Sequence, residues 1–300
     1  MKQQSATSKL LPYEKVTTLL PRAGRYRIGL GANSAPELLQ RRNGQQYQLQ
    51  SNAAWQTGVR PAPARTGLGT SSTFAVGMLN AFYALKGKYA DKKKLADEAI
   101  YLERVLCNEA GGWQDQIAAS FGGFNRINFN ADGYEVLPII ISPERKKQLN
   151  NNLMMFFTGF TRFSSEVQKA NAASSPIDKS VYLKQMYDLV DDAEMVLVDK
   201  TRDLDDFGRL LDKTWKLKRQ TGGSVSTNSI DGLYARGIEA GALGGKLLGA
   251  GGGGFLVFYV QPEKQEAVRT AMSDLMYIPF EFENGGTRVI HYTPEAYEPK

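Results

Sequence analysis

Apolar residues recur with regular spacing only from about residue 70 onward. Helical spacing predicts one helix from there to Gly87 and another from Lys92 to Asn108. A serine at the start of the first helix, Ser71 or Ser72, is expected to cap it. The apolar face predicted for the first helix consists of Phe74, Met78, Ala81, Phe82 and Leu85. The stripe predicted for the second consists of Leu95, Ala99, Leu102 and Leu106.

The rest of the pattern mixes strands and helices without regular alternation. A strand-rich segment is predicted over residues 12–29, whereas residues 30–66 carry no periodic pattern. Further strands are predicted at 124–129, 135–141, 153–158, 255–260, 278–283 and 287–292. Helices are predicted near 162–173, at 178–200 and 203–219, from Asn228 or Ser229, and from Pro262 to about Met276. This mixture favours an α+β protein with one lobe over residues 1–142 and another over 143–300.

The composition excludes several classes of site. Cys107 is the only cysteine and His291 the only histidine, so an internal disulfide and multi-histidine or cysteine-rich metal sites are excluded. A Ser-His-Asp triad would have to use His291, which has no nucleophile elbow nearby. The N-terminal residues lack the apolar segment of a secretory signal, and no apolar run approaches the roughly 20 residues that span a bilayer. We therefore expect a cytoplasmic protein without membrane contact.

The distribution of charged residues indicates which class of binding partner to expect. The formal net charge is +6, and the basic residues are scattered apart from the runs 92–94 and 145–147, which are expected to be solvated. Basic and aromatic residues do not interleave as they do in nucleic-acid binding platforms. No nucleic-acid partner is expected, and a small anionic substrate fits the charge better.

Two glycine-rich stretches carry the candidate chemistry. Gly67–Thr73 ends in hydroxyl residues and runs directly into a predicted helix. Glycine allows backbone N–H groups to approach a ligand closely, and a helix N-terminus favours an anion, so this stretch indicates a phosphate site. The second stretch, Gly249–Gly254, is too rich in glycine for the interior of a helix or strand. Taken alone, the first stretch is better explained as a glycine-rich turn capped by serine, and the alternative for the second is a wide turn between strands.

The motifs together resemble the GHMP kinases, which include galacto-, homoserine, mevalonate and phosphomevalonate kinases. Within that superfamily they are most similar to the D-glycero-D-manno-heptose 7-phosphate kinases. The resemblance runs from about Pro63 to Arg288. It is carried, in the order of the family, by Thr66–Thr73, Glu103-Arg104, Gly111–Gln116, Phe121–Asn125, Thr158–Arg162 and Gly244–Phe255.

The resemblance implies a two-lobed fold with a ribosomal S5 domain 2-like N-terminal lobe and a ferredoxin-like C-terminal lobe, and it implies ATP and Mg²⁺. The ATP phosphates would meet Gly67, Leu68, Gly69, Thr70, Ser71 and Ser72, and Mg²⁺ would meet Ser71 and Glu103. Asp115 would be the base. The second loop, through Gly249, Ala250, Gly251, Gly252 and Gly253, would approach the phosphates, and Gly111, Gly112 and Arg162 would contact the substrate.

Each role has a structural alternative. Asp115 could cap the helix that follows it, Glu103 could pair with a surface lysine or arginine, and Arg162 could lie on a helix surface. The loop at 249–254 could be a wide turn between strands. Lys246 is assigned no role beyond that of a strand-edge lysine.

The chain departs from the family near its beginning. The family opens with a strand and a glycine-rich substrate loop, which this sequence lacks, so its N-terminal lobe is expected to be incomplete. Arg65 stands where the family has glycine. The expected activity is ATP-dependent phosphorylation of a sugar or sugar phosphate, above all heptose 7-phosphate at C1. The alternatives are an inactive nucleotide- or sugar-binding homologue and a fucokinase- or galactokinase-like enzyme. A homodimer is a possible assembly.

Overall fold

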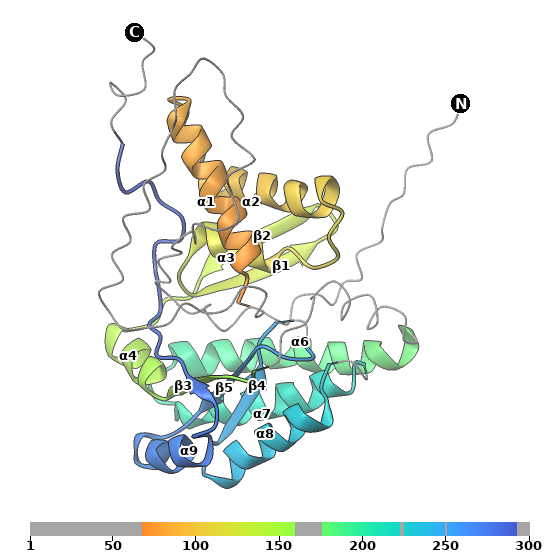
Figure 1. The fold of residues 1–300 in the computed structure, drawn as a ribbon, viewed down its shortest axis with the longest axis vertical. Coiled ribbons are helices and arrows are strands. Elements are labelled where there is room, and N and C mark those ends of the chain that lie inside the picture. Colours follow the sequence, from red (N-terminus) through yellow and green to blue (C-terminus); the bar gives the residue numbers. More distant parts are fainter. Residues whose placement is uncertain (1–67, 160–175, 223–224, 250, 293–300) are drawn as a thin grey trace.

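The computed structural model of the chain describes residues 68–159, 176–222, 225–249 and 251–292. These residues form two α+β lobes, one above the other in Figure 1. The strands predicted within residues 12–29 and the helix predicted near 162–173 lie outside the described residues. Within the described ranges, no helix is long and apolar enough to cross a membrane.

The upper lobe consists of three helices, a π-helical turn and a β-hairpin. These elements are α1 (Thr70–Leu85), α2 (Lys92–Tyr101), η2 (Leu102–Leu106), α3 (Gln114–Phe121), β1 (Asn125–Asn130) and β2 (Gly133–Pro138). The two strands are antiparallel, with Asn125 opposite Pro138 and Asn130 opposite Gly133. Ile117 of α3 is fully buried and packs with Ile127 of β1, so the helices cover one side of the hairpin.

Helix α1 corrects two sequence predictions. Its N-cap is Gly69 in the left-handed region, with φ 68°, and no side chain caps it, so the predicted serine cap is wrong. The predicted face is also wrong, because Phe74, Phe82 and Leu85 are exposed. The face that packs on α2 and α3 carries the smaller side chains Ser72, Ala75 and Val76. Small residues let neighbouring helices approach closely, and they leave the larger apolar groups on the other side.

The second predicted helix forms, but its last turn is a π-helix. The amide of Cys107 donates to the carbonyl of Leu102 at 2.9 Å, which is the wider i→i+5 pattern. The wider turn changes which side chains face inward. Leu106 is therefore exposed, contrary to the predicted stripe, whereas Glu103 is only 5% exposed.

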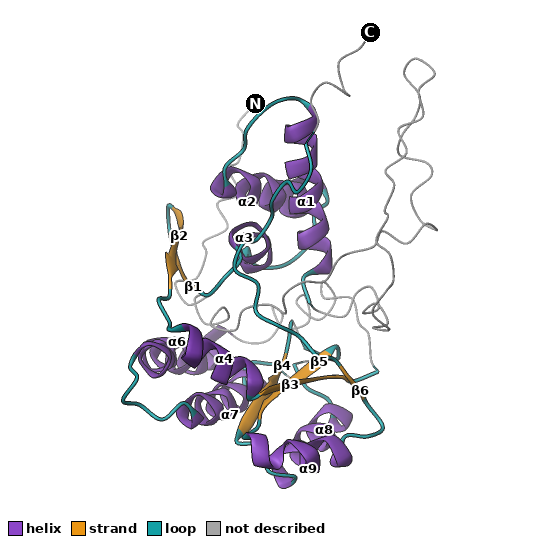
Figure 2. Ribbon diagram, turned by 90° about the vertical axis from the view of Figure 1, so that its left-hand side faces the viewer, coloured by secondary structure: helices purple, strands orange, loops and turns teal. Residues whose placement is uncertain are grey.

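The lower lobe is a four-stranded antiparallel sheet covered by helices on both faces (Figure 2). The strand order is β4-β5-β3-β6, with β3 Leu153–Phe157, β4 Gly244–Leu247, β5 Phe255–Tyr259 and β6 Met276–Tyr277. The helices are α4 (Pro143–Asn151), α6 (Pro176–Val198), α7 (Asp205–Arg219), α8 (Asn228–Glu239) and α9 (Gln265–Ala271), the last preceded by the 3₁₀ turn η3 (Pro262–Lys264).

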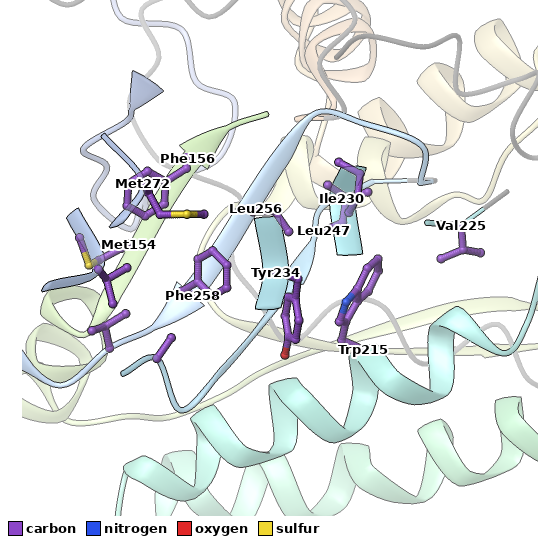
Figure 3. Packing of buried hydrophobic residues seen from close by; sticks show 13 residues of the cluster. Met154, Phe156, Trp215, Val225, Ile230, Tyr234, Leu247, Leu256, Phe258 and Met272 are labelled. Carbon is purple, nitrogen blue, oxygen red and sulfur yellow. The ribbon is translucent and has the colours of Figure 1, made fainter. Parts of the chain in front are cut away.

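Strand β5 shows why both faces are covered. All five of its residues are buried, and the four from Leu256 to Tyr259 alternate between two cores, while Phe255 belongs to a third cluster. Leu256 and Phe258 pack toward α8 and α9, whereas Val257 and Tyr259 pack toward α4, α6 and α7. Figure 3 shows the first core, in which Val225, Ile230 and Trp215 gather at the end opposite Met154 and Met272.

The chain after β6 does not form the strands predicted at 278–283 and 287–292. It leaves the sheet and crosses to the upper lobe, where its backbone finds other partners (Figure 1). The amide of Gly123 donates to the carbonyl of Glu283 at 2.8 Å, and the amide of Thr287 donates to the carbonyl of Ala119 at 3.1 Å. Lys92, predicted to be solvated, donates to the carbonyls of Phe121 and Gly285. This segment therefore ties the lobes together.

Helix α7 and strand β4 touch through two glycines. A Cβ built on Gly244 would lie 1.9 Å from the carbonyl oxygen of Gly208, and one on Gly208 would lie 2.7 Å from the ring of Tyr259. Backbone therefore lies directly against backbone at this point. This contact fixes α7 over the strand that leads into the loop Gly249–Gly254.

We expect Gly244→Ala to lower the free energy of unfolding by about 1–3 kcal/mol or more, because its methyl group must push α7 away from β4. Gly232→Ala in α8 is the matched control, since no atom lies within 4 Å of its added Cβ. That control should keep or raise stability by about 0.4–1 kcal/mol. Urea unfolding measures both, and equal stability of the two variants would contradict the contact.

Candidate functional site

The buried carboxylate of Glu103 joins the first turns of two helices. Ser72 Oγ in α1 donates to Glu103 Oε2 at 2.9 Å, and Gln116 Nε2 in α3 donates to the same oxygen. Glu103 Oε1 is buried and has no hydrogen-bond partner among the described residues. The alternative that Glu103 pairs with a surface cation is therefore wrong, because both contacts are to neutral groups inside the lobe.

The start of α1 has the form of an anion site. Gly69 takes the left-handed conformation that turns the chain into the helix, and the amide of Thr73 donates to its carbonyl at 2.9 Å. The first amides of a helix have no partner within it, and they carry the positive end of its dipole. Ser72 points to Glu103, while Ser71, the predicted metal ligand, is exposed on the same turn. The metal role of Ser71 stays a prediction.

Asp115 lies in the first turn of α3 and is partly buried. The N-cap of this helix is Trp113, and no side chain caps it, so the alternative role of Asp115 as a helix cap is not supported. The next residue, Gln116, donates to Glu103. Asp115 therefore sits on a helix start whose position is tied, through Glu103, to the start of α1.

The predicted substrate glycines precede α3 and are held by Arg104. Its guanidinium donates to the carbonyl of Gly112 at 2.7 Å and to that of Glu109 at 3.2 Å. Gly111 has φ 151° and lies close enough to Arg104 that a Cβ would come 2.7 Å from a guanidinium nitrogen. Arg104 thus fixes the path of the chain just before Asp115. The motif contains this arginine, but the sequence does not show its contacts.

The second glycine loop is held from three directions. Thr158 both donates to the carbonyl of Gly254 and accepts from its amide, at 3.0 and 3.1 Å. The amide of Gly252 donates to the carbonyl of Val225 at 3.1 Å. At the other end, Lys218 Nζ donates to the carbonyl of Gly249 at 2.8 Å. The loop is an anchored structure rather than a loose turn.

Glycine is required in this loop for a specific reason. Gly251 has φ 119°, and a Cβ there would lie 2.7 Å from the carbonyl oxygen of Val225. Only glycine combines this conformation with such a close approach. The described glycines at 249, 251, 252, 253 and 254 all have positive φ.

The two glycine segments come together in the fold. Leu68, which leads into Gly69, packs against the cluster Met155, Phe255 and Ile278. Leu248 packs against the same cluster, and Leu248 and Phe255 flank the second loop. Helix α1 accordingly begins at its lower end, next to the lower lobe (Figure 1). The anion site at α1 and the glycine loop therefore belong to one region at the junction of the lobes.

Two lysines lie at the base of the glycine loop. The sequence analysis considered Lys246 and gave it no role, and it did not single out Lys218. Lys246 on β4 is only 7% exposed, and Lys218 on α7 is partly buried. Desolvation, and after it the charge of Lys246, lowers the pKa of Lys218 from 10.5 to about 7. The helical spacing from Leu211 through Trp215 to Lys218 could have indicated that Lys218 faces inward.

Three predicted site residues, Gly67, Arg162 and Ala250, lie outside the described residues. Within the part of the chain that the structure describes, no group of three or more His, Cys, Asp or Glu side chains could hold a metal ion. The single buried oxygen of Glu103 is therefore the observation on which a metal proposal rests.

Two family models match the chain along most of the region described above. The GHMP kinases N terminal domain matches residues 34–123, and the GHMP kinases C terminal domain matches residues 195–278. The chain belongs to the GHMP kinase family. The predicted two-lobed α+β fold of a GHMP kinase is confirmed.

Named relatives of this GHMP kinase include sugar kinases. It is 33% identical over 211 residues to the D-glycero-alpha-D-manno-heptose 7-phosphate kinase of Campylobacter jejuni, covering 68% of this chain and 60% of the relative. It is 29% identical to the L-fucokinase/L-fucose-1-P guanylyltransferase of Bacteroides fragilis, covering 69% of this chain and 22% of that protein. The chain thus spans at most about three fifths of these curated relatives.

The chain is also similar in structure to a solved heptose kinase. The D-glycero-D-manno-heptose 1-phosphate kinase of Bacteroides thetaiotaomicron superposes with a TM-score of 0.52 and is 28% identical, covering 75% of this GHMP kinase and 63% of that chain. The likeness concerns the fold and the order of the elements that carry the site.

We expect Glu103→Gln to lower the free energy of unfolding by about 1–3 kcal/mol, because its amide group would be a buried donor without an acceptor. If Glu103 holds Mg²⁺, the same change should also raise the Mg²⁺ concentration needed for half-maximal nucleotide binding, because a neutral amide is a poorer ligand.

Glu135→Gln on the exposed face of the hairpin is the control and should change neither quantity. Denaturant unfolding and calorimetric Mg²⁺ titration measure the two effects. A less stable Glu103→Gln protein with unchanged Mg²⁺ dependence would leave Glu103 a purely structural residue.

Proposed function

We propose that the chain is an ATP-dependent kinase that phosphorylates a hydroxyl of a sugar or sugar phosphate. The preferred substrate is D-glycero-D-manno-heptose 7-phosphate, phosphorylated at C1. The observation that carries the proposal is the convergence of the α1 start and the glycine loop, with Asp115 tied to the same region through Glu103. The name of the Campylobacter relative supports heptose 7-phosphate, and the name of the Bacteroides structure, a heptose 1-phosphate kinase, supports only a heptose phosphate as the class of sugar involved.

Under this proposal, each group of residues has a separate role in the reaction. The amides at the start of α1 and those of the glycine loop bind and orient the triphosphate of ATP. The Asp115 carboxylate orients the attacking hydroxyl and accepts its proton. A bond forms between the hydroxyl oxygen and the γ-phosphorus, the bond from that phosphorus to the β–γ bridging oxygen breaks, and ADP leaves. Little covalent chemistry is required of the protein, so positioning dominates.

The residues present fit a magnesium ion. Glu103 Oε1 is a buried hard oxygen without a hydrogen-bond partner, and the hydroxyl of Ser71 lies exposed on the adjacent helix turn. Mg²⁺ binds few protein oxygens and keeps waters and phosphate oxygens, so these two ligands suffice. Bound there, it would neutralise phosphate charge as the reaction proceeds.

A second candidate substrate is L-fucose, because the Bacteroides fragilis relative with fucokinase in its name matches a similar share of this chain, 69% against 68% for the Campylobacter relative. A coupled ADP-release assay with heptose 7-phosphate, fucose and galactose separates the candidates. We expect the highest kcat/KM with heptose 7-phosphate. Higher kcat/KM with fucose would replace the substrate, and ADP release with none of the three would contradict the proposed sugar-kinase activity.

Asp115→Asn should lower turnover by about 10²–10⁴-fold, because the amide cannot accept the hydroxyl proton. Nucleotide affinity should stay nearly unchanged, since the amide keeps the size of the side chain. Steady-state kinetics and calorimetry with a non-hydrolysable ATP analogue measure the two quantities.

Asp132→Asn in the exposed hairpin turn is the control and should retain full turnover. Melting temperatures of both variants separate catalysis from folding. If the Asp115→Asn enzyme is fully folded and keeps more than about a tenth of normal turnover, set against the usual effect of removing a base, Asp115 is not that base.

A further inference from the structure

Two adjacent residues of the π-helical turn η2 hold the chain on both sides of Asp115. Glu103 accepts a hydrogen bond from the side chain of Gln116, the residue directly after Asp115. Arg104 donates to the carbonyl of Gly112, three residues before Asp115, at 2.7 Å. The start of α3 is therefore attached to η2 at two points, and Asp115 lies between them.

The loop between η2 and α3 folds back onto η2, which brings its carbonyls within reach of Arg104. Asn108 takes the left-handed conformation, with φ 51°, which asparagine tolerates better than most residues do. The next amide, that of Glu109, donates to the carbonyl of Glu103 at 2.9 Å. The carbonyl of Glu109 in turn accepts a hydrogen bond from Arg104 at 3.2 Å. One guanidinium thus joins two points of the loop, Glu109 and Gly112.

The chemistry of Arg104 suits this task. A guanidinium is planar and carries N–H groups at fixed angles, so a single side chain can hold two carbonyls that lie three residues apart. A lysine presents one ammonium on a flexible stem and does not fix two acceptors in the same way. The closeness of the chain adds to the constraint, because a Cβ on Gly111 would come 2.7 Å from a guanidinium nitrogen.

Apolar packing fixes the rotation of α3 about its axis. Ile117 is fully buried in the cluster that also contains Ile127, and Trp113 packs against this cluster. Successive helical residues are about 100° apart, so Asp115 lies nearly opposite Ile117 around the helix. The apolar contacts set which way the first turn faces, whereas Arg104 sets where the chain enters that turn.

We propose that Arg104 is a positioning residue for the reaction, which acts through the carbonyl of Gly112 to place the carboxylate of Asp115 against the attacking hydroxyl. The inference rests on the proposed kinase function, in which Asp115 is the base. Proton transfer requires the two groups to be within hydrogen-bond reach, and a misplacement of about 1 Å can lower turnover by about 10²-fold. In the described part of the chain, both hydrogen bonds of Arg104 go to backbone carbonyls, so its effect on the reaction passes through the chain.

The test compares Arg104→Met with Arg145→Met. Arg145 is a matched control because its guanidinium also donates to backbone carbonyls, those of Val196 and Arg202, but it lies on α4 in the lower lobe and is only 9% exposed. Removing either arginine should lower stability. At saturating substrates we expect Arg104→Met to lower kcat about 10- to 100-fold per folded molecule, and Arg145→Met to leave it nearly unchanged.

A second arm shows whether Arg104 acts through Asp115. In the Asp115→Asn background the base is already absent, so adding Arg104→Met should lower kcat further by no more than about twofold. Losses that multiply in the double variant would show that Arg104 affects the reaction independently of Asp115, and they would overturn the proposal. Should Arg104→Met not fold, Arg104→Lys carries both arms, and turnover equal to that of the unaltered protein would then overturn the proposal.

Hydrogen–deuterium exchange of the peptide covering residues 111–121 measures the same hold without turnover. The amide of Ile117 donates to the carbonyl of Trp113 at 3.2 Å, which is a backbone hydrogen bond at the start of α3. Loss of the anchor at Gly112 should let this hydrogen bond open more often. Arg104→Met should therefore speed exchange in the peptide, and Arg145→Met should not.

These outcomes separate the inference from the kinase proposal. ADP release by the unaltered protein together with an unchanged kcat in Arg104→Met would contradict the inference and leave the kinase function standing. No ADP release by the unaltered protein would contradict the kinase function, and the exchange measurement would then decide alone whether Arg104 holds the start of α3. Faster exchange in Arg104→Met than in Arg145→Met supports that hold, and equal exchange in the two overturns it.

Discussion

The geometry of the site depends on the hydrogen bonds from Ser72 and Gln116 to one buried oxygen of Glu103. These bonds fix the start of α1 relative to the start of α3, and thus the anion site relative to Asp115. A buried carboxylate is costly unless it is well hydrogen-bonded, so the arrangement tolerates few substitutions. Glu103 lies in the π-helical turn, where it is buried while Leu106 is exposed. One side chain in that turn thereby links the positions of two other helices.

In the lower lobe, the glycine loop Gly249–Gly254 is held by contacts from residues outside the loop. Thr158, Val225 and Lys218 lie in three separate segments of the chain, and each binds the backbone of the loop at a different point. The conformational cost of a glycine-rich segment is therefore met by contacts made in folding, not at the moment a ligand binds. The segment that crosses back after β6, through Glu283 and Thr287, keeps the two halves of the site in register.

The sequence was sufficient for most elements and for the family, and the reasons for its failures are physical. Periodicity located α6, α7, α8 and β5 because each buries a continuous apolar face or run. It failed on α1, where the large apolar residues are exposed and the small ones such as Ala75 are buried, because close packing selects for size as well as polarity. It could not foresee that Ser72 rather than Ser71 meets Glu103, since adjacent residues point about 100° apart on a helix and the motif contains both. The contact of Lys218 could not be predicted from the sequence, because its partner is a backbone carbonyl, and every residue has one.

The charged groups near the junction of the lobes are of opposite sign in the two lobes. The upper lobe offers the carboxylates of Glu103 and Asp115, and the lower lobe offers the ammonium groups of Lys218 and Lys246. A polyphosphate with its bound cation has the complementary arrangement, because the cation favours the carboxylates and the phosphate oxygens favour the lysines. Under the proposed function, this separation of charge sets the orientation of the ligand as well as its affinity. A ligand turned end for end would face repulsion at both lobes, so under the proposed function these charges would select the productive orientation.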